Sequence, residues 1–310
     1  MKFIIVDHVH PVLFELFDAE GIEYDYVPEI QQDILSGIIS NYQGLIVRNK
    51  RIDKQLIQKA KRLQYIGRAG AGLDNIDIVQ AFAQNIHVVN AAEANRDTLG
   101  EHTLGMLLCL LNKINISHAR LRTSLWDREG GRGIELNGKT VSIIGYGNMG
   151  TAFAQRLKGF DCKVLYFDRK EKNNPFEFVQ KADLETVFKE SDIVSLHIPL
   201  DAHNNRWVNE TFINSFTKNI YLINVARGEV VESNALVQAL KNGKILGACI
   251  DVFENEKLET FTEEQRANFD YLVQQDHVVF TPHVAGWSVE SYEKISRVLF
   301  QKLIKHLKNA

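Results

Sequence analysis

Cysteine is scarce in this 310-residue sequence, which contains only Cys109, Cys162 and Cys249. The three are far apart and each lies in an apolar stretch, so they are typical of buried thiols rather than of a metal site or a disulfide framework. An excess of charge of one sign is also missing, because 36 basic and 39 acidic residues leave a formal net charge of −3. We therefore expect neither a nucleic-acid nor a membrane partner, and no metal.

Long apolar stretches are missing as well. No segment is long enough to span a bilayer, and no signal peptide precedes the first expected strand at residues 3–6. We therefore expect a cytoplasmic protein. The remaining composition, 45% hydrophobic and 24% charged, is ordinary for a globular protein, and the length suits one large or two medium domains.

The first ninety residues alternate between short β-branched segments and amphipathic segments. Strands are expected at residues 3–6, 23–27, 44–47, 63–67 and 87–89, and helices at 12–19, 30–39, 54–61 and 76–84. This alternation predicts a parallel sheet covered by helices on both faces. A second strand–helix series, from Val141 to about residue 284, predicts a second α/β domain, and residues 289–307 have the pattern of an amphipathic helix.

A long helix is expected at residues 98–115, between the two series. Its leucines and methionine cover most of the helix surface, which is typical of a helix buried either inside a domain or against a second subunit. Residues 126–138 form a Gly- and charge-rich connection to the second series.

A glycine-rich turn follows the expected strand at residues 140–144. Gly145 allows a tight turn, Gly147 lets the backbone approach a pyrophosphate, and Gly150 lets the next helix pack on the strand. The helix start offers N–H groups and a positive dipole end to the phosphates. Asp168 ends the next strand, where it would accept hydrogen bonds from the adenosine ribose and repel a 2′-phosphate. The pattern predicts a bound dinucleotide, NAD.

Two alternatives stay open for this turn. It could be a strand–helix connection that binds nothing. The cofactor could also be NADP, because Arg169 and Lys170 follow Asp168 and a basic side chain there could neutralise a 2′-phosphate.

Polar residues follow three expected strands of the second series. Arg227, Asp251 and His283 each come directly after an apolar strand, and Glu256 follows Asp251 closely. Ligands of open parallel sheets bind outside the carboxyl ends of the strands, so these side chains are expected to converge on one edge. Each has a simpler interpretation: a surface cation for Arg227, a turn histidine for His283 and a solvated carboxylate for Glu256.

Together, the three side chains suit hydride transfer between a nicotinamide and a small anionic 2-hydroxy or 2-keto acid. Histidine can exchange a proton with the substrate oxygen near neutral pH. The planar fork of arginine can bind the substrate carboxylate and the developing alkoxide together. A carboxylate next to the histidine would orient its ring.

Six motifs carry a resemblance that covers essentially the full chain. They are GRAGAGLDNID at residues 67–77, GYGNMG at 145–150, VSLHIPL at 194–200, NVARG at 224–228, DVFENE at 251–256 and TPHVAG at 281–286. With these motifs the chain resembles the D-isomer-specific 2-hydroxyacid dehydrogenase family. The resemblance implies an α/β fold of two doubly wound parallel-sheet domains with a cleft between them. It implies a flavodoxin-like substrate domain of residues 1–93 and 287–310, and a Rossmann NAD-binding domain of residues 94–286.

The resemblance also implies roles for individual residues. Arg227 would bind the substrate, His283 would be the acid/base, and Glu256 would be its partner. The Ala71-Gly72 backbone would hold the substrate carboxylate, and Asp251 would bind the nicotinamide carboxamide. The implied cofactor-binding residues are Gly145, Gly147, Asn148, Met149, Gly150, Asp168, His197, Pro199, Val225, Ala226 and Asp251. The helix at 98–115 matches the dimerisation segment of the family, which implies a homodimer.

Two departures from the family pattern concern the segment after Glu256. The family usually has a proline there, and this chain has Lys257. Glu254 therefore remains an alternative partner for His283. The segment 257–275 is also long and charged, and its simplest interpretation is a solvent-exposed insertion.

Within the family the sequence resembles short forms of 3-phosphoglycerate dehydrogenase, which implies a role in serine biosynthesis. Arg48 and Arg68 match positions where those enzymes carry cations that face the substrate, and a buried phosphate needs such partners. Alternatively, both arginines pair with acidic neighbours such as Asp53 or Asp74. Trp287 could cover the active site or pack between domains. Other substrates remain open, including glyoxylate and hydroxypyruvate, as does a non-enzymatic NADH-sensing scaffold.

Overall fold

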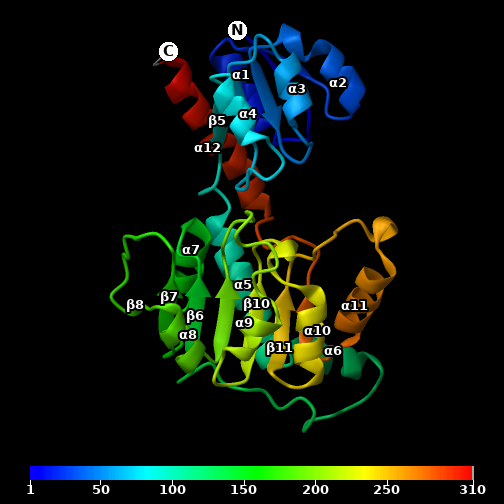
Figure 1. The fold of residues 1–310 in the computed structure, drawn as a ribbon, viewed down its shortest axis with the longest axis vertical. Helices are drawn as coiled ribbons and strands as arrows, with labels where there is room; N and C mark the ends of the chain where they lie inside the picture. The colour runs from blue at the N-terminus through cyan, green and yellow to red at the C-terminus, as the bar shows by residue number, and fades with distance from the viewer. Residues whose placement is uncertain (309–310) are drawn as a thin grey trace. The chain divides into compact units, whose positions relative to one another are not determined.

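The computed structural model describes residues 1–308 and contains two compact units. The first unit comprises Met1–Asn95 and the segment that starts at Trp287, and the second comprises Arg96–Gly286. Each unit is an open parallel sheet with helices on both faces (Figure 1). The predicted α/β fold of two doubly wound sheets is therefore confirmed.

The first unit contains a five-stranded parallel sheet in the order β2-β1-β3-β4-β5, the flavodoxin-like order. Its strands are β1 (Lys2–Ile5), β2 (Glu23–Tyr26), β3 (Gly44–Val47), β4 (Tyr65–Arg68) and β5 (His87–Asn90). Its helices are α1 (Val12–Ala19), α2 (Gln32–Ile38), α3 (Lys54–Lys59), α4 (Ile78–Ala83) and α12 (Val289–Lys308), with a 3₁₀ turn at Ile39–Asn41.

Helix α12 returns from the end of the sequence to complete the core of the first unit. Ile295, Leu299 and Leu303, spaced four residues apart, lie on one face of the helix and are buried among side chains of β1, β4 and α1. A side chain at Gly67, in the middle of β4, would come within 3.3 Å of Leu299. The glycine therefore lets this helix approach the sheet closely.

The second unit contains a seven-stranded parallel sheet in the order β12-β11-β10-β9-β6-β7-β8. Its strands are β6 (Thr140–Ile144), β7 (Lys163–Phe167), β8 (Val179–Lys181), β9 (Ile193–Leu196), β10 (Ile220–Asn224), β11 (Ile245–Ile250) and β12 (Val278–Phe280). Its helices are α5 (Arg96–Leu111), α6 (Ile114–Arg122), α7 (Asn148–Arg156), α8 (Leu184–Glu190), α9 (Glu210–Asn214), α10 (Ser233–Lys241) and α11 (Glu263–Gln274), with 3₁₀ turns at Gly228–Val230 and Leu258–Thr260. Strands β7 and β8 are added on one side of β6, and β9 to β12 on the other. The strand order therefore reverses between β6 and β9, and such a switch point is where parallel sheets bind ligands.

The long helix expected at residues 98–115 is shorter than predicted. Helix α5 ends at Leu111, and Lys113 has a left-handed backbone with φ of 52°, after which α6 begins at Ile114. Isoleucines resume after the break at positions 114 and 116, so the apolar pattern alone does not reveal where the helix ends. Helix α5 packs against α7 and buries Met106, Leu107 and Leu110 in the core of its own unit.

The segment 257–275 is not simply a solvent-exposed insertion, as its charge suggested. Most of it forms α11, which begins with a capping box between Thr262 and Gln265. Leu272 is fully buried, and the Phe261 and Phe269 rings pack against the Phe253 ring at centroid distances of 5.6 Å. The helix is thus a covering layer for the sheet near β12.

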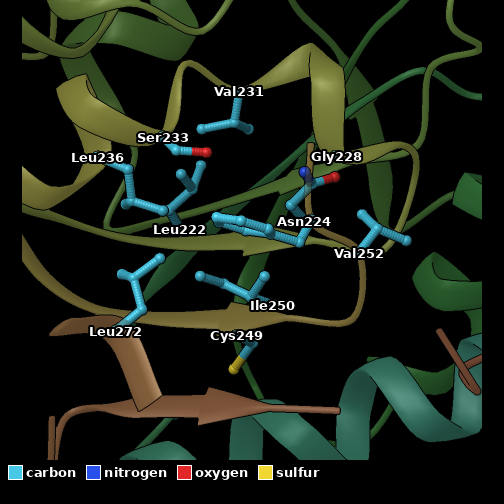
Figure 2. A pocket seen from close by; sticks show the side chains of 11 residues that line it. Leu222, Asn224, Gly228, Val231, Ser233, Leu236, Cys249, Ile250, Val252 and Leu272 are labelled. Atoms are coloured by element: carbon cyan, nitrogen blue, oxygen red, sulfur yellow. The ribbon is translucent and has the colours of Figure 1, made fainter. Parts of the chain in front are cut away.

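A small cavity lies inside the second unit, under α10 (Figure 2). Its volume is about 10 Å³, close to the least that can hold one water molecule. Its walls are mainly apolar core side chains such as Leu222, Leu236, Ile250 and Leu272. It is therefore a gap in the packing and too small for a substrate.

None of the helices in the described part of the chain combines the length and the apolar character needed to cross a lipid bilayer.

Candidate active site

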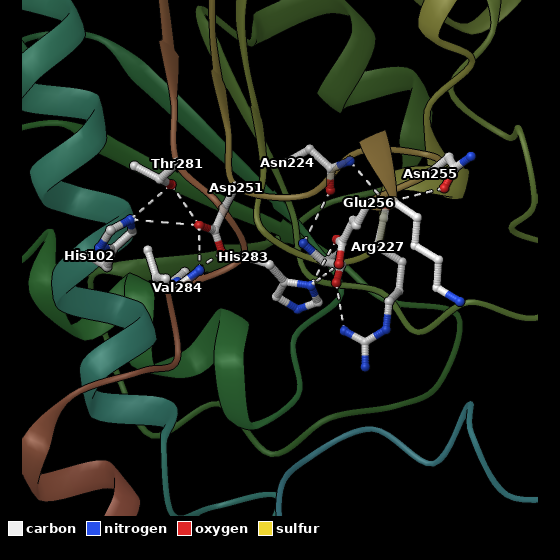
Figure 3. Close-up of polar contacts among 12 residues, drawn as sticks. His102, Asn224, Arg227, Asp251, Asn255, Glu256, Thr281, His283 and Val284 are labelled. Carbon is white, nitrogen blue, oxygen red and sulfur yellow. Dashed lines mark hydrogen bonds and ion pairs between the residues drawn. The ribbon is translucent and has the colours of Figure 1, made fainter. Parts of the chain in front are cut away.

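Three polar side chains lie at the carboxyl edge of the second sheet. Arg227 follows β10, Asp251 follows β11 and His283 follows β12, and these strands are parallel neighbours. Figure 3 shows Arg227, Glu256 and His283 at this edge, with Asp251 on the other side of His283, beside Thr281 and Val284. The strand order, which the sequence did not specify, is what brings the three segments together.

His283 forms a close pair with Glu256. The Nδ1 atom of His283 lies 2.8 and 2.9 Å from the two carboxylate oxygens of Glu256. An ionised carboxylate only accepts hydrogen bonds, so Nδ1 carries the proton of this bond. Within residues 1–308, Nε2 of His283 has no hydrogen-bond partner, and nearly half of each side chain is exposed. The pair therefore presents Nε2 to solvent as a proton donor or acceptor.

Glu254, the alternative partner, points elsewhere. Its carboxylate lies 3.8 Å from the Arg206 guanidinium, and only 13% of its side chain is exposed. The departure at Lys257 also has a local explanation. The Lys257 N–H donates a 3.0 Å hydrogen bond to Asn255 Oδ1, which a proline could not make, and this bond helps to shape the loop that carries Glu256.

The buried carboxylate of Asp251 holds the loop that carries His283. Its Oδ1 accepts hydrogen bonds from the Thr281 hydroxyl (2.6 Å) and the Val284 N–H (2.9 Å), and its Oδ2 accepts one from the Ala285 N–H (2.8 Å). The Asp251 carbonyl accepts the N–H of His283 at 2.7 Å. His283 itself has a left-handed backbone, with φ of 55°, which these bonds stabilise. Binding of the carboxamide by Asp251 stays a prediction.

Arg227 stands on a turn stabilised by Asn224. The Asn224 side chain accepts from the Ala226 N–H at 3.1 Å and donates to the Arg227 carbonyl at 3.0 Å. Gly228 is required next to Arg227, because a Cβ there would lie 1.9 Å from the backbone of Phe253. The turn after β10 and the loop after β11 therefore touch through their backbones. The NVARG motif contains Asn224 and Gly228, but it assigns no structural role to either, and only the fold reveals these roles.

The glycine turn has the shape that a dinucleotide needs. Gly145 has φ of +93°, and a Cβ there would lie 2.5 Å from the His197 carbonyl oxygen. A Cβ at Gly150 would lie 2.1 Å from the Gly145 carbonyl oxygen, so helix and turn pack in contact. At Gly147 a Cβ would meet nothing within 4 Å, which leaves open space beside the helix start. No side chain caps α7, so its first N–H groups can bind a phosphate.

Three polar residues near this turn are Asp168, Arg169 and His197. Asp168 accepts the N–H groups of Tyr146 (2.9 Å) and Lys170 (2.8 Å), which orients its carboxylate toward the turn. Arg169 forms an ion pair with Asp201 at 3.0 Å, so this basic neighbour already has a carboxylate partner. His197 hydrogen-bonds the Ser195 hydroxyl at 2.8 Å, its Nδ1 is buried without a partner, and burial lowers the pKa of His197 to about 3. His197 is therefore neutral, and its Nδ1 has no hydrogen-bond partner within residues 1–308.

The predicted substrate-binding residues of the first unit lie at the carboxyl edge of its sheet. Arg68 is the last residue of β4 and its guanidinium lies over Gly70, where a Cβ would clash with it. Arg48 follows β3, and within residues 1–308 its guanidinium forms no ion pair. The alternative pairing of Arg48 with Asp53 is wrong, because the Asp53 carboxylate caps α3 through the Leu56 N–H.

The backbone at Ala71 and Gly72 follows the same strand. The Ala71 carbonyl accepts a hydrogen bond of 2.6 Å from the side chain of Asn90, at the end of β5. This bond fixes the loop after β4, and the role of the loop in holding a carboxylate stays a prediction.

Comparison with known proteins decides the family. The model of the D-isomer specific 2-hydroxyacid dehydrogenase family, NAD binding domain, matches residues 104–285. The chain belongs to this family. A glyoxylate reductase of Thermofilum pendens is 34% identical over 288 residues, which cover 91% of this chain and 83% of that protein.

Two further relatives cover nearly the whole chain. A D-3-phosphoglycerate dehydrogenase of Methanocaldococcus jannaschii is 32% identical across 98% of this chain, which spans only 57% of that protein's length. The solved structure of D-lactate dehydrogenase from Aquifex aeolicus, complexed with NAD and lactic acid, has a TM-score of 0.87. It is 25% identical, and the match covers 100% of this chain and 96% of that one.

Membership of the 2-hydroxyacid dehydrogenase family confirms three predictions. The family that the six motifs predict is confirmed. The chain is an NAD-dependent oxidoreductase of this family, and its cofactor is NAD. The relatives act on different 2-hydroxy or 2-keto acids by their names, so the comparisons leave the substrate open.

Replacing Asp251 by asparagine should destabilise this 2-hydroxyacid dehydrogenase. The carboxylate accepts three hydrogen bonds. In asparagine an NH₂ group replaces one of the two oxygens, and this group cannot accept a hydrogen bond from the N–H or O–H group that points at it. Loss of one or two charged hydrogen bonds in a buried site costs about 2–4 kcal/mol. We expect a clearly lower unfolding temperature of the Asp251→Asn variant by calorimetry. The control is Asp183→Asn, because Asp183 is an exposed N-cap and asparagine caps equally well. Equal unfolding temperatures for both variants would contradict the role of Asp251.

Proposed function

We propose that this enzyme transfers a hydride between NADH and a phosphorylated 2-keto acid, with 3-phosphoglycerate and phosphohydroxypyruvate as the substrate pair. The observation that carries the choice is Arg48, a cation at the carboxyl edge of the first sheet that forms no ion pair within residues 1–308. A cation that forms no ion pair within the described residues is suited to an anionic ligand. Arg68 is proposed to bind the same phosphoryl group.

The proposed mechanism assigns one task to each of three site residues in the second unit: His283, Glu256 and Arg227. NADH, when bound, supplies the hydride. His283 gives the proton on Nε2 to the carbonyl oxygen, and the pair with Glu256 keeps that nitrogen facing outward. Arg227 binds the substrate carboxylate and stabilises the negative charge that develops on the oxygen. In the oxidative direction His283 takes the proton back.

The proposed cofactor site combines the glycine turn with the edge of the second sheet. The α7 start would bind the pyrophosphate, and Asp168 would accept the adenosine ribose hydroxyls. The nicotinamide half of the cofactor would lie against Val225, Ala226, Asp251 and the segment 197–199. The ion pair of Arg169 with Asp201 supports NAD over NADP, because this arginine is engaged away from a 2′-phosphate.

A second candidate substrate is glyoxylate or hydroxypyruvate. The 34% identity to a glyoxylate reductase favours it, and that relative matches more of its own length than the phosphoglycerate dehydrogenase does. Neither acid carries a phosphoryl group, so the two candidates differ in whether Arg48 and Arg68 contribute to binding.

NADH oxidation with four acids separates the candidates. Phosphohydroxypyruvate, hydroxypyruvate, glyoxylate and pyruvate would be compared by kcat/KM, each with NADH and with NADPH. Two charge-assisted contacts to a phosphoryl group correspond to roughly 100-fold or more in kcat/KM, so we expect phosphohydroxypyruvate to exceed hydroxypyruvate by at least that factor. Hydroxypyruvate or glyoxylate as the better substrate would reject the phosphoryl assignment and leave the dehydrogenase intact.

A homodimer is also part of the proposal. The proposed contact lies along residues 98–115, because α5 buries one face in its own unit and leaves Glu101 and Gly105 exposed, and it continues onto α6. Helix α6 has no buried residue, and its Ile114 and Leu121 side chains are at least half exposed. Leu125 and Trp126 follow α6 in the sequence and are also exposed, Trp126 at 84%.

A further inference from the structure

The Arg48 guanidinium lies on two aromatic rings of the first unit. Its Cζ atom is 4.0 Å from the centroid of the Trp287 ring and 5.7 Å from that of Tyr292. Both distances are within the range of a cation–π interaction, and the Trp287 contact is the closer one. Arg48 comes from the end of β3, whereas the two rings come from the start of α12, about 240 residues later in the sequence.

The Asp7 carboxylate attracts this guanidinium electrostatically but forms its hydrogen bonds with backbone groups. One oxygen of Asp7, after β1, accepts the backbone N–H groups of Arg48, Asn49 and Lys50 at 2.7, 2.9 and 3.0 Å. Asp7 therefore fixes the turn from which Arg48 projects. The side chain of Arg48 is left to the aromatic rings, and within residues 1–308 no oxygen accepts a hydrogen bond from it.

Trp287 is held in place by the way α12 begins. Ser288 and Ser291 exchange hydrogen bonds between side chain and backbone, at 2.8 and 3.0 Å, in the manner of a capping box. Trp287 precedes this cap, and Tyr292 lies in the first turn of the helix. Their rings contact each other at 4.8 Å, which is the position of a hydrophobic staple. The helix start thus sets the orientation of the ring on which Arg48 rests.

A guanidinium that lies against an aromatic ring keeps its N–H donors available, whereas one in an ion pair uses them to bind the carboxylate. A ring binds the face of the guanidinium, and the five N–H donors lie in its plane. Those donors stay available for a planar or tetrahedral anion. Burial also lowers the pKa of Arg48, because the half-buried guanidinium is partly withdrawn from water.

We propose that Trp287 is a positioning residue for the substrate phosphoryl group: it holds the Arg48 guanidinium by its face and leaves its N–H edge to the anion. This inference rests on the proposed function, because it assumes a phosphorylated substrate. It assigns to Trp287 a selective task, which is to favour substrates with a second anionic group over those with a single carboxylate.

Removing the aromatic face tests the proposal. Trp287→Leu keeps an apolar side chain but ends the cation–π contact, which for a half-buried arginine corresponds to about 5- to 30-fold in binding. We expect kcat/KM for phosphohydroxypyruvate to fall by that factor, mainly through a higher KM. The ratio of kcat/KM for phosphohydroxypyruvate to that for hydroxypyruvate should fall with it. Trp287→Phe should restore most of the ratio, since it keeps an aromatic face.

A double variant separates positioning from general damage. If Trp287 acts through Arg48, Trp287→Leu should add no further loss of the ratio to Arg48→Gln. The matched control is Phe82→Leu, which removes another aromatic ring of the same unit whose side chain is 82% exposed and should leave the ratio unchanged. Equal losses for both substrates, or additive losses in the double variant, would overturn the role of Trp287.

Failure of the proposed function would be visible in a different measurement. A wild-type enzyme that does not prefer phosphohydroxypyruvate rejects the substrate assignment, and the inference with it. A wild-type enzyme with the preference, together with a Trp287→Leu variant that retains it in full, rejects only the inference.

Discussion

Replacing Arg227 by glutamine should lower kcat/KM by roughly two to four decades, because two charge-assisted interactions are lost, worth about 3–6 kcal/mol together. One is made to the substrate carboxylate and is present before and during the reaction. The other grows as negative charge develops on the substrate oxygen, so it contributes mainly to kcat. We therefore expect both a higher KM and a lower kcat, measured by NADH oxidation with the best substrate of the panel.

Lysine at this position is an informative second variant. Arg227→Lys keeps the positive charge but loses the planar fork that can bind two oxygen atoms at once. It should recover only part of the loss, chiefly in KM. Arg206→Gln is the matched control, since Arg206 is an exposed arginine of the same unit that lies 3.8 Å from Glu254. Turnover of Arg227→Gln close to that of the wild type would refute the proposed mechanism.

Replacing His283 by glutamine should lower kcat by about 10²- to 10⁴-fold, the usual contribution of a positioned acid or base. The proton donor is the ring nitrogen opposite Glu256, and glutamine cannot release a proton near neutral pH. NADH binding, followed by fluorescence, should persist, because the variant leaves the glycine turn intact. His203→Gln, at an exposed histidine of the same unit, is the control.

Glu256 provides an internal check on the histidine. Glu256→Gln should cost less than His283→Gln, since an amide oxygen can still accept the Nδ1 proton. In the double variant the loss should equal that of His283→Gln alone, because Glu256 acts only through the ring. A double variant much slower than His283→Gln would show that Glu256 has a task of its own.

Most of the secondary structure could be predicted from local patterns. The strand at residues 44–47 and the helix at 12–19 were predicted with their observed bounds, and the glycine turn was located with its flanking strand and helix. Alternation of short β-branched segments with amphipathic ones is a property of neighbouring residues, so the sequence alone reveals it. The break at Lys113 was missed because a left-handed residue leaves no trace in hydrophobicity.

The site was predictable as a set of candidates. Motifs indicated Arg227, His283 and Glu256, but left Glu254 open as the partner of the histidine. The fold separates the two carboxylates, since Glu254 turns toward Arg206 and Glu256 toward His283. The two glutamates are two residues apart in the sequence, and the loop after β11 directs their side chains to different partners.

By itself, then, the sequence of this protein determined its α/β class, its dinucleotide turn and the family, because these depend on local periodicity and on motifs of a few residues. The tertiary structure alone decided the strand order that aligns β10, β11 and β12. It also decided that the charged segment 257–275 covers the sheet, and that Arg48 rests on Trp287. Those outcomes depend on packing between residues far apart in the chain, where burial and hydrogen bonding of whole elements outweigh local preference.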